Sequence, residues 1–215
     1  MKLPPELCDA PEERVGRRRL YMTGEERRAF LTAADAAPGP LRTLCYVLAY
    51  TGCKPREALS VTAAHVDLAT RAISFESLPR RRKAITRTVP VPAHVIDDLD
   101  RVHAIRSAQD APDRGLSVPL WRWSRHTARN RVNRVIELSG IQPGPHATAR
   151  GLRHAYAVTA LANGIPLDLL QKWLGYADIY KAGRAYGQDP SRSPCRQDHT
   201  RLQEYELASR MWDHF

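Results

Sequence analysis

Arg150 is followed three and four residues later by Arg153 and His154, so a helix would place these three cationic side chains on one face. Thr148 and Gly151 indicate that the helix begins here. Cations near a helix N-terminus oppose the helix dipole, at roughly 0.3–1 kcal/mol each, so their clustering calls for a compensating anion. A phosphate is the obvious candidate, and ordinary solvent-exposed arginines on a basic protein are the alternative.

Two more cations, Lys54 and Arg56, stand at another expected helix start. Gly52 is typical of a helix end, and Pro55 suits the first turn of the next helix. The helix dipole again favours an anion where the sequence supplies cations. Two such helix starts in one chain indicate that both face the same anion.

The order of these motifs resembles the catalytic domain of the tyrosine recombinases, the phage integrase family. The blocks that carry the resemblance are T-G-C-K-P-R-E at 51–57, R-G-L-R-H at 150–154 and L-G-Y at 174–176, followed by Tyr186. The family usually reads T-G-x-R-x-x-E, H-x-L-R-H and L-G-H ahead of a nucleophilic tyrosine. The resemblance covers roughly residues 20–186 and implies a mainly α fold with a small antiparallel β-hairpin or sheet (α+β).

Membership of this family would imply transesterification at a DNA phosphodiester. A tyrosine attacks phosphorus, leaves a 3′-phosphotyrosyl enzyme and frees a 5′-hydroxyl that attacks a second strand, so neither a metal nor another cofactor is expected. The site must stabilise negative charge on a five-coordinate phosphorus and protonate the leaving oxygen. Arginines meet the first need through forked, permanently charged donors, and a lysine or histidine meets the second.

Among the expected catalytic residues, Arg153 keeps the family identity. Lys54 stands where the first arginine is usual, Arg150 where histidine or lysine is usual, and Tyr176 where the histidine of L-G-H is usual. Tyr186 lies one residue later than the usual nucleophile. These departures describe a degenerate active site. They leave two functions open: an active recombinase or integrase, and a catalytically impaired relative that binds DNA as a regulator or accessory factor.

The elements that must position these residues are predicted from periodicity. Segments 72–77 and 84–91 favour two strands that flank the turn L-P-R-R-R-K. In the family, such a turn carries a lysine that reaches the scissile phosphate. Arg80 or Lys83 would fill that role here, and a solvated basic turn is the alternative.

A helix capped by Ser124 and ending before Gly140 turns a polar face outward that carries two arginines and an asparagine. Arginine reads guanine and asparagine reads adenine in DNA grooves, so we expect groove or backbone contact, with a solvated face as the alternative. The candidate DNA-binding residues are Arg56, Arg125, Arg129, Asn130 and His154.

Further helices are predicted from apolar stripes and caps. Thr23 and Glu26 form a capping-box signature. The expected helices cover about 24–36, 41–50, 93–107, 166–174 and the last residues of the chain. The expected organisation is a basic lead-in arm (1–20), a recombinase-like catalytic domain (21–190), and an insertion with a C-terminal helix (191–215).

Charge and composition narrow the class of partner. Lys plus Arg number 33 against 23 Asp plus Glu, a net charge of +10, which indicates a polyanionic partner. Double-stranded DNA is expected, on which the chain could assemble as a homo-oligomer; an interaction protein for acidic partners rests on the net charge alone. The sequence contains no apolar run of about 18 residues and no signal-peptide core, so neither a membrane nor secretion is expected.

The cysteines form no C-x-x-C pair, and two of them lie in apolar helical pattern. This usage indicates reduced thiols and a cytoplasmic protein. With DNA as its expected partner, the protein would be nucleoid-associated. Cys195 and His199 make only half of a metal site, so no metal is expected.

Overall fold

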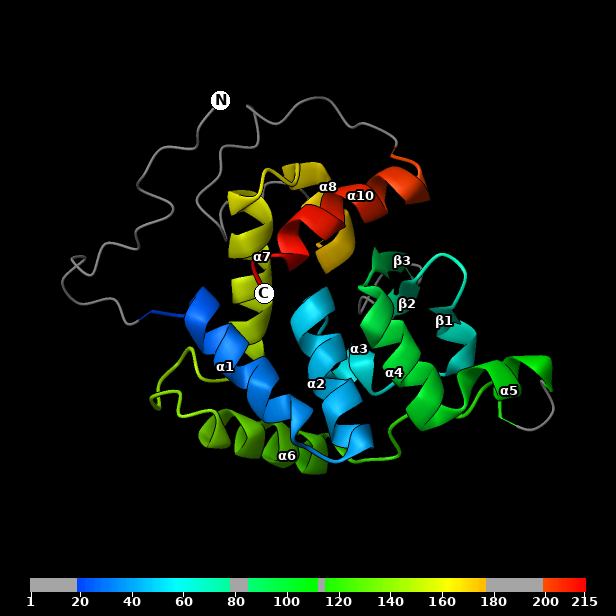
Figure 1. Cartoon of the computed structure of the whole chain (residues 1–215), viewed down its shortest axis with the longest axis horizontal. Helices are drawn as coiled ribbons and strands as arrows, with labels where there is room; N and C mark the ends of the chain where they lie inside the picture. The colour runs from blue at the N-terminus through cyan, green and yellow to red at the C-terminus, as the bar shows by residue number, and fades with distance from the viewer. Residues whose placement is uncertain (1–18, 78–84, 112–114, 177–198) are drawn as a thin grey trace.

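Helices make up most of the described part of the chain, and one small sheet accompanies them there (Figure 1). The computed structural model describes residues 19–77, 85–111, 115–176 and 199–215. In chain order the elements are α1 (Gly24–Asp35), α2 (Gly39–Thr51), α3 (Pro55–Ala58), the 3-10 turn η2 (Ala63–His65), β1 (Val66–Asp67), β2 (Ala72–Ser77), β3 (Ile85–Pro90), α4 (Ala93–His103), α5 (Ile105–Asp110), α6 (Arg125–Leu138), α7 (Ala149–Ala162), α8 (Leu167–Leu174) and α10 (Arg201–Trp212). The predicted fold class, mainly α with a small antiparallel sheet, is confirmed.

Helix α2 lies at the centre of the helical layer, between α1, α4 and α7 (Figure 1). Its apolar residues extend round most of its surface, and Leu44, Val47 and Leu48 are fully buried. A helix that is apolar on nearly all sides must be enclosed by others, which explains this position. The end of α2 therefore places the 51–57 motif inside the body of the protein.

The sheet has the order β1-β2-β3, with both pairs antiparallel. Side chains alternate along β2, so that Ile73 and Phe75 are buried while Glu76 is exposed. On β3, Arg87 lies opposite Phe75 and is also buried. The two predicted strands are confirmed, whereas β1 was not predicted because two residues are too few to show a pattern. The turn between β2 and β3 lies outside the described residues.

Two predicted helix boundaries were wrong. The helix expected over 93–107 is two helices, because Ala104 adopts a left-handed conformation (φ 51°) between α4 and α5. The apolar stripe nevertheless continues across this break, since Ile105 is buried. Helix α2 begins at Gly39, earlier than predicted, with Pro40 in its first turn. A proline is tolerated there because backbone N–H groups in the first turn have no acceptor within the helix.

Helix α10 packs on α7, β3 and α8. Its buried Glu204 accepts a hydrogen bond from Nε1 of Trp173 at 3.1 Å and pairs with Lys172. After α10, the carbonyl oxygen of His214 accepts a hydrogen bond from Arg27 of α1 at 3.0 Å. The C-terminal helix expected from the sequence is thus docked on the body of the protein.

The arm predicted for residues 1–20 and the insertion predicted from residue 191 lie largely outside the described residues, so the domain boundaries stay predictions. None of the helices in the described ranges is long and apolar enough to cross a membrane.

Candidate active site

The turn between α2 and α3 presents Lys54. Gly52 ends α2 in a left-handed conformation (φ 59°), and Lys54 is the N-cap of α3, as the sequence predicted. The backbone N–H of Lys54 donates to Oε2 of Glu57 at 2.8 Å, which fixes the turn. The Lys54 side chain is 46% exposed and its Nζ lies 3.6 Å from Oε1 of Glu57. The cation is therefore held at the surface by a buried carboxylate.

Arg153 connects this turn to two other elements. It lies on α7 and is only 8% exposed. Its Nη1 donates to the carbonyl oxygen of Gly52 at 2.8 Å, and its Nη2 donates to that of Leu174 at 2.8 Å. Its Cζ also lies 5.2 Å from the ring centroid of Tyr176. Three motifs that are far apart in the sequence thus meet at one guanidinium group.

Thr148 caps α7, as predicted, by accepting a hydrogen bond from the backbone N–H of Gly151 at 3.1 Å. The next residues along this helix differ in exposure: Arg150 is exposed and His154 is half-buried. Burial lowers the pKa of His154, and the positive charges of Arg150 and Arg153 lower it further. At neutral pH the imidazole is therefore uncharged.

The lowered pKa of His154 predicts that the protein loses stability as the pH falls below about 6.5. Above that pH the imidazole is neutral in both states. Below it, the unfolded chain binds a proton that the folded chain still rejects, because the folded-state pKa is depressed. The loss grows until the pH passes the folded-state pKa.

Denaturant unfolding at pH 7 and pH 5 measures this effect, and His154→Gln should lose less stability between the two pH values than wild type does. The exposed His126→Gln is the matched control and should behave as wild type. An identical loss in His154→Gln and wild type would contradict the prediction.

Tyr176 follows the left-handed Gly175 (φ 67°) that ends α8. Its backbone N–H donates to the carbonyl oxygen of Gln171 at 3.1 Å, and the side-chain amide of Gln171 donates to the carbonyl oxygen of Tyr176 at 3.1 Å. The half-buried ring faces the Arg153 guanidinium. The local backbone thus holds Tyr176 beside Arg153, the expected catalytic residue that keeps the family identity.

Four of the five candidate DNA-binding side chains lie on the surface, whereas His154 is half-buried, and contact with DNA stays a prediction. Arg56 is exposed on α3, and Arg125, Arg129 and Asn130 are exposed on α6. The Asn130 amide lies 3.0 Å from Nε2 of His126, one turn earlier on the same helix. Helix α6 therefore offers a basic, amide-bearing face to solvent.

One residue of this site was missed in the sequence. Arg87 of β3 is 2% exposed; its Nε donates to the carbonyl oxygen of Trp173 at 2.7 Å and its Nη2 to Oε2 of Glu57 at 2.7 Å. The alternation of a strand could have revealed it, because Arg87 shares a face with the apolar Val89. An arginine on the core face of a strand needs a buried partner, and that partner is Glu57.

Three predicted catalytic residues, Arg80, Lys83 and Tyr186, lie outside the described residues, so their roles stay predictions. Within the described ranges, no group of three or more His, Cys, Asp or Glu side chains is placed to hold a metal ion.

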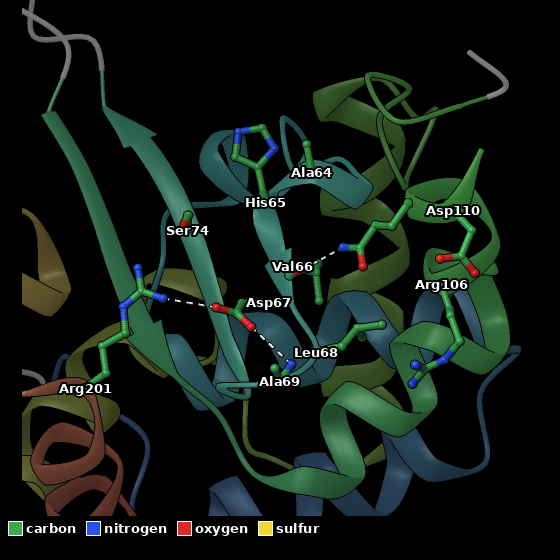
Figure 2. Close-up of a pocket in the computed structure, with 11 residues that line it drawn as sticks. Ala64, His65, Val66, Asp67, Leu68, Ala69, Ser74, Arg106, Asp110 and Arg201 are labelled. Atoms are coloured by element: carbon green, nitrogen blue, oxygen red, sulfur yellow. Dashed lines mark hydrogen bonds and ion pairs between the residues drawn. The ribbon is translucent and has the colours of Figure 1, made fainter. Parts of the chain in front are cut away.

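A polar groove of about 720 Å³ is lined by none of the catalytic candidates (Figure 2). It lies beside β1 and α5, and Arg201 of α10 closes one side. Arg201 pairs there with Asp67 at 3.0 Å, and the Gln109 amide donates to the carbonyl oxygens of Ala63 and Val66 at 2.9 and 2.7 Å. None of the residues that line this groove belongs to the site at Arg153.

Comparison with known proteins decides the family. The sequence model of the phage integrase family matches residues 20–191. This chain belongs to the phage integrase family. The predicted resemblance to tyrosine recombinases is thereby confirmed, and the integrase match includes all three motifs that meet at Arg153.

Among curated relatives, this integrase family chain is similar to the tyrosine recombinase XerD of Brucella abortus, in both strain 9-941 and strain 2308. Identity to each relative is 32% over an alignment of 165 residues, and the match covers 71% of this chain and 52% of the relative. The chain thus spans about half the length of the curated relatives it matches.

Solved structures share the fold. The XerA recombinase superposes with a TM-score of 0.66 at 22% identity, over 89% of this chain and 66% of that one. The XerH recombinase in its pre-cleavage complex with difH gives 0.62 at 21% identity, over 84% and 53%. The catalytic domain of bacteriophage HP1 integrase gives 0.55 at 21% identity, over 81% of this chain and 91% of that one. The integrase family chain therefore has the fold of a recombinase catalytic domain.

Proposed function

We propose that this chain is the catalytic part of a site-specific DNA recombinase or integrase, which cleaves and joins strands through a 3′-phosphotyrosyl intermediate. The observation that supports this most is the convergence of the Lys54 turn, Arg153 and the Tyr176 turn around one buried guanidinium. Family membership adds to it. Tyr186 would attack phosphorus, and Arg80 or Lys83 would reach the scissile phosphate. Of these two, Lys83 could protonate the leaving 5′-oxygen, because an arginine does not give up its proton.

Arg153 is suited to stabilise the negative charge that develops on the scissile phosphate during cleavage. Two of its N–H donors hold the carbonyl oxygens of Gly52 and Leu174, so the guanidinium is fixed before substrate arrives. An arginine has five such donors, and the others remain for phosphate oxygens. Donors that are already oriented stabilise a developing oxyanion without reorganisation during the reaction. The exposed Lys54 and Arg150 would add positive charge, and Tyr176 a hydrogen bond.

Double-stranded DNA is the proposed partner, and it implies a cytoplasmic, nucleoid-associated protein. The phosphate backbone of the DNA would contact the exposed donors of α3 and α6, and the net charge of +10 on the protein favours such binding. Assembly of several copies on one DNA site is part of the same proposal. The XerH structure is described as a complex with its difH substrate, which supports DNA as the partner class for this fold.

Lys54→Arg is expected to increase the rate of covalent adduct formation by about 10-fold or more. A lysine is a point charge, whereas an arginine supplies a fork that binds two phosphate oxygens, and one oriented donor is typically worth about 10²–10³ in rate. The measurement is a denaturing gel of protein mixed with nicked DNA from the sequences that flank the gene. The Lys54→Met variant is the matched control and should be slower than wild type.

The alternative function is DNA binding without cleavage, as a regulator or accessory factor. The observation that favours it is the lysine at position 54, a point charge where the family usually has the forked donors of an arginine. If neither wild type nor Lys54→Arg forms an adduct on DNA that both bind in a salt-dependent manner, this alternative replaces the recombinase.

A further inference from the structure

Glu57 places a negative charge inside a site that must attract phosphate. Its carboxylate is 2% exposed, accepts the Lys54 backbone N–H and lies 3.6 Å from Nζ of Lys54. An uncompensated carboxylate in this position would hold Lys54 for itself and repel DNA. The structure must therefore neutralise Glu57 with another group if Lys54 is to meet a phosphate.

Arg87 supplies that charge. Its Nη2 donates to Oε2 of Glu57 at 2.7 Å, and both side chains are 2% exposed. The guanidinium lies 5.0 Å from the ring centroid of Phe75, its neighbour on β2, which helps to fix its plane. Because the pair is buried, the attraction between Arg87 and Glu57 is only weakly screened, and the positive charge of Arg87 balances the carboxylate.

The same guanidinium also holds the end of α8. Nε of Arg87 donates to the carbonyl oxygen of Trp173, and Arg153 takes the next carbonyl oxygen, that of Leu174. A Cβ atom added to Gly175 would lie only 3.1 Å from Nη1 of Arg87, so the arginine is in close contact with the turn that leads to Tyr176. Two buried arginines thus tie the Tyr176 turn to the Lys54 turn.

We propose that Arg87 is a positioning residue for DNA cleavage, which neutralises Glu57 so that Lys54 stays available to a phosphate, and which keeps the Tyr176 turn in register with Arg153. The inference rests on the proposed function for its role in cleavage. Its effect on Lys54 is a statement about phosphate binding, and that can be measured whether or not cleavage occurs.

The test uses the full chain and a DNA duplex that wild type binds, and it measures the slope of log affinity against log salt concentration. Arg87→Met should reduce the magnitude of the slope by about 0.9, the value for one phosphate contact. The reason is that Lys54 would pair with the uncompensated Glu57 and lose its contact with a DNA phosphate. Glu57→Gln/Arg87→Met should restore the slope, since the uncompensated charge is gone. Arg87→Lys should keep it, since the charge remains.

A double-mutant cycle separates this role from general structural damage. In a Lys54→Met background, Arg87→Met should not change the slope further, because the contact that it affects is already absent. Damage spread over the fold would instead add to the effect of Lys54→Met. Thermal melting of every variant identifies loss of folding, and if Arg87→Met does not fold, the double variant Glu57→Gln/Arg87→Met and Arg87→Lys carry the test.

On nicked DNA, Arg87→Met should lower the rate of adduct formation by about 10²-fold, the effect of one lost oriented donor, and Arg87→Lys by less. A wild-type slope in folded Arg87→Met, or a failure of the folded double variant to bind as wild type does, would overturn the inference. Absence of an adduct from wild type, with the slopes as expected, would overturn the proposed cleavage and leave the role of Arg87 in phosphate binding supported.

Discussion

Arg153→Gln is expected to reduce covalent adduct formation by at least about 10²-fold. The substitution removes a permanently charged fork from the point where three motifs meet. It also removes the donors to the carbonyl oxygens of Gly52 and Leu174, each of which would lose a buried hydrogen bond at about 1–3 kcal/mol. The turns that carry Lys54 and Tyr176 would then no longer be held to α7. Denaturing gels over a time course on nicked DNA measure the rate.

The control is Arg129→Gln, which removes an exposed arginine from α6 and leaves the buried network intact. It should weaken DNA binding and leave the adduct rate at saturating DNA close to that of wild type. Melting temperatures show how much of the effect of Arg153→Gln comes from lost stability. An adduct rate above one tenth of wild type in folded Arg153→Gln would show that Arg153 is not catalytic.

Gly151→Ala is expected to lower the free energy of unfolding by more than about 3 kcal/mol. A Cβ atom on Gly151 would lie 1.7 Å from the carbonyl oxygen of His146, and that atom belongs to the backbone. Relief would require the segment before α7 to move, although Thr148 caps the helix there through the N–H of Gly151. The glycine between Arg150 and Leu152 is thus required by packing, before any chemistry is considered.

Denaturant unfolding measures this loss, and Gly24→Ala is its control. Nothing lies within 4 Å of a Cβ atom added to Gly24, the first residue of α1. That substitution should be neutral or stabilise the protein by about 0.4–1 kcal/mol, because alanine restricts the unfolded chain. A loss below about 1 kcal/mol in Gly151→Ala would mean that the segment around His146 moves aside easily.

The parts of the fold that the sequence predicts are those with local causes. Thr23, Ser124 and Thr148 each accept a hydrogen bond from a backbone N–H three residues later, so their caps depend on neighbours alone. The outward face of α6 and the buried stripe on its other side follow from helical period. In the site, the Arg153 bond to Gly52 brings the two cationic helix starts together, and that both face one anion stays a prediction.

The parts that the sequence did not predict depend on contacts between distant residues. Arg87 interacts with Glu57 and Trp173, which are 30 and 86 residues away, and no local pattern links them. The break at Ala104 falls inside an apolar stripe that continues on both sides of it. Strand β1 follows η2 and pairs Val66 with Ile73. A strand of two residues is too short to show a periodic pattern in the sequence.

The central claim is tested most directly by mapping the residue that becomes joined to DNA. Wild-type protein is reacted with nicked DNA, the adduct is digested with trypsin and nuclease, and mass spectrometry locates the nucleotide remnant. We expect it on Tyr186, with the Tyr186→Phe variant forming no adduct while still binding the DNA. A remnant on another tyrosine, such as Tyr176, or an undiminished adduct in Tyr186→Phe, would contradict the assignment of the nucleophile. No adduct with wild type or Lys54→Arg on DNA that both bind would contradict the recombinase itself.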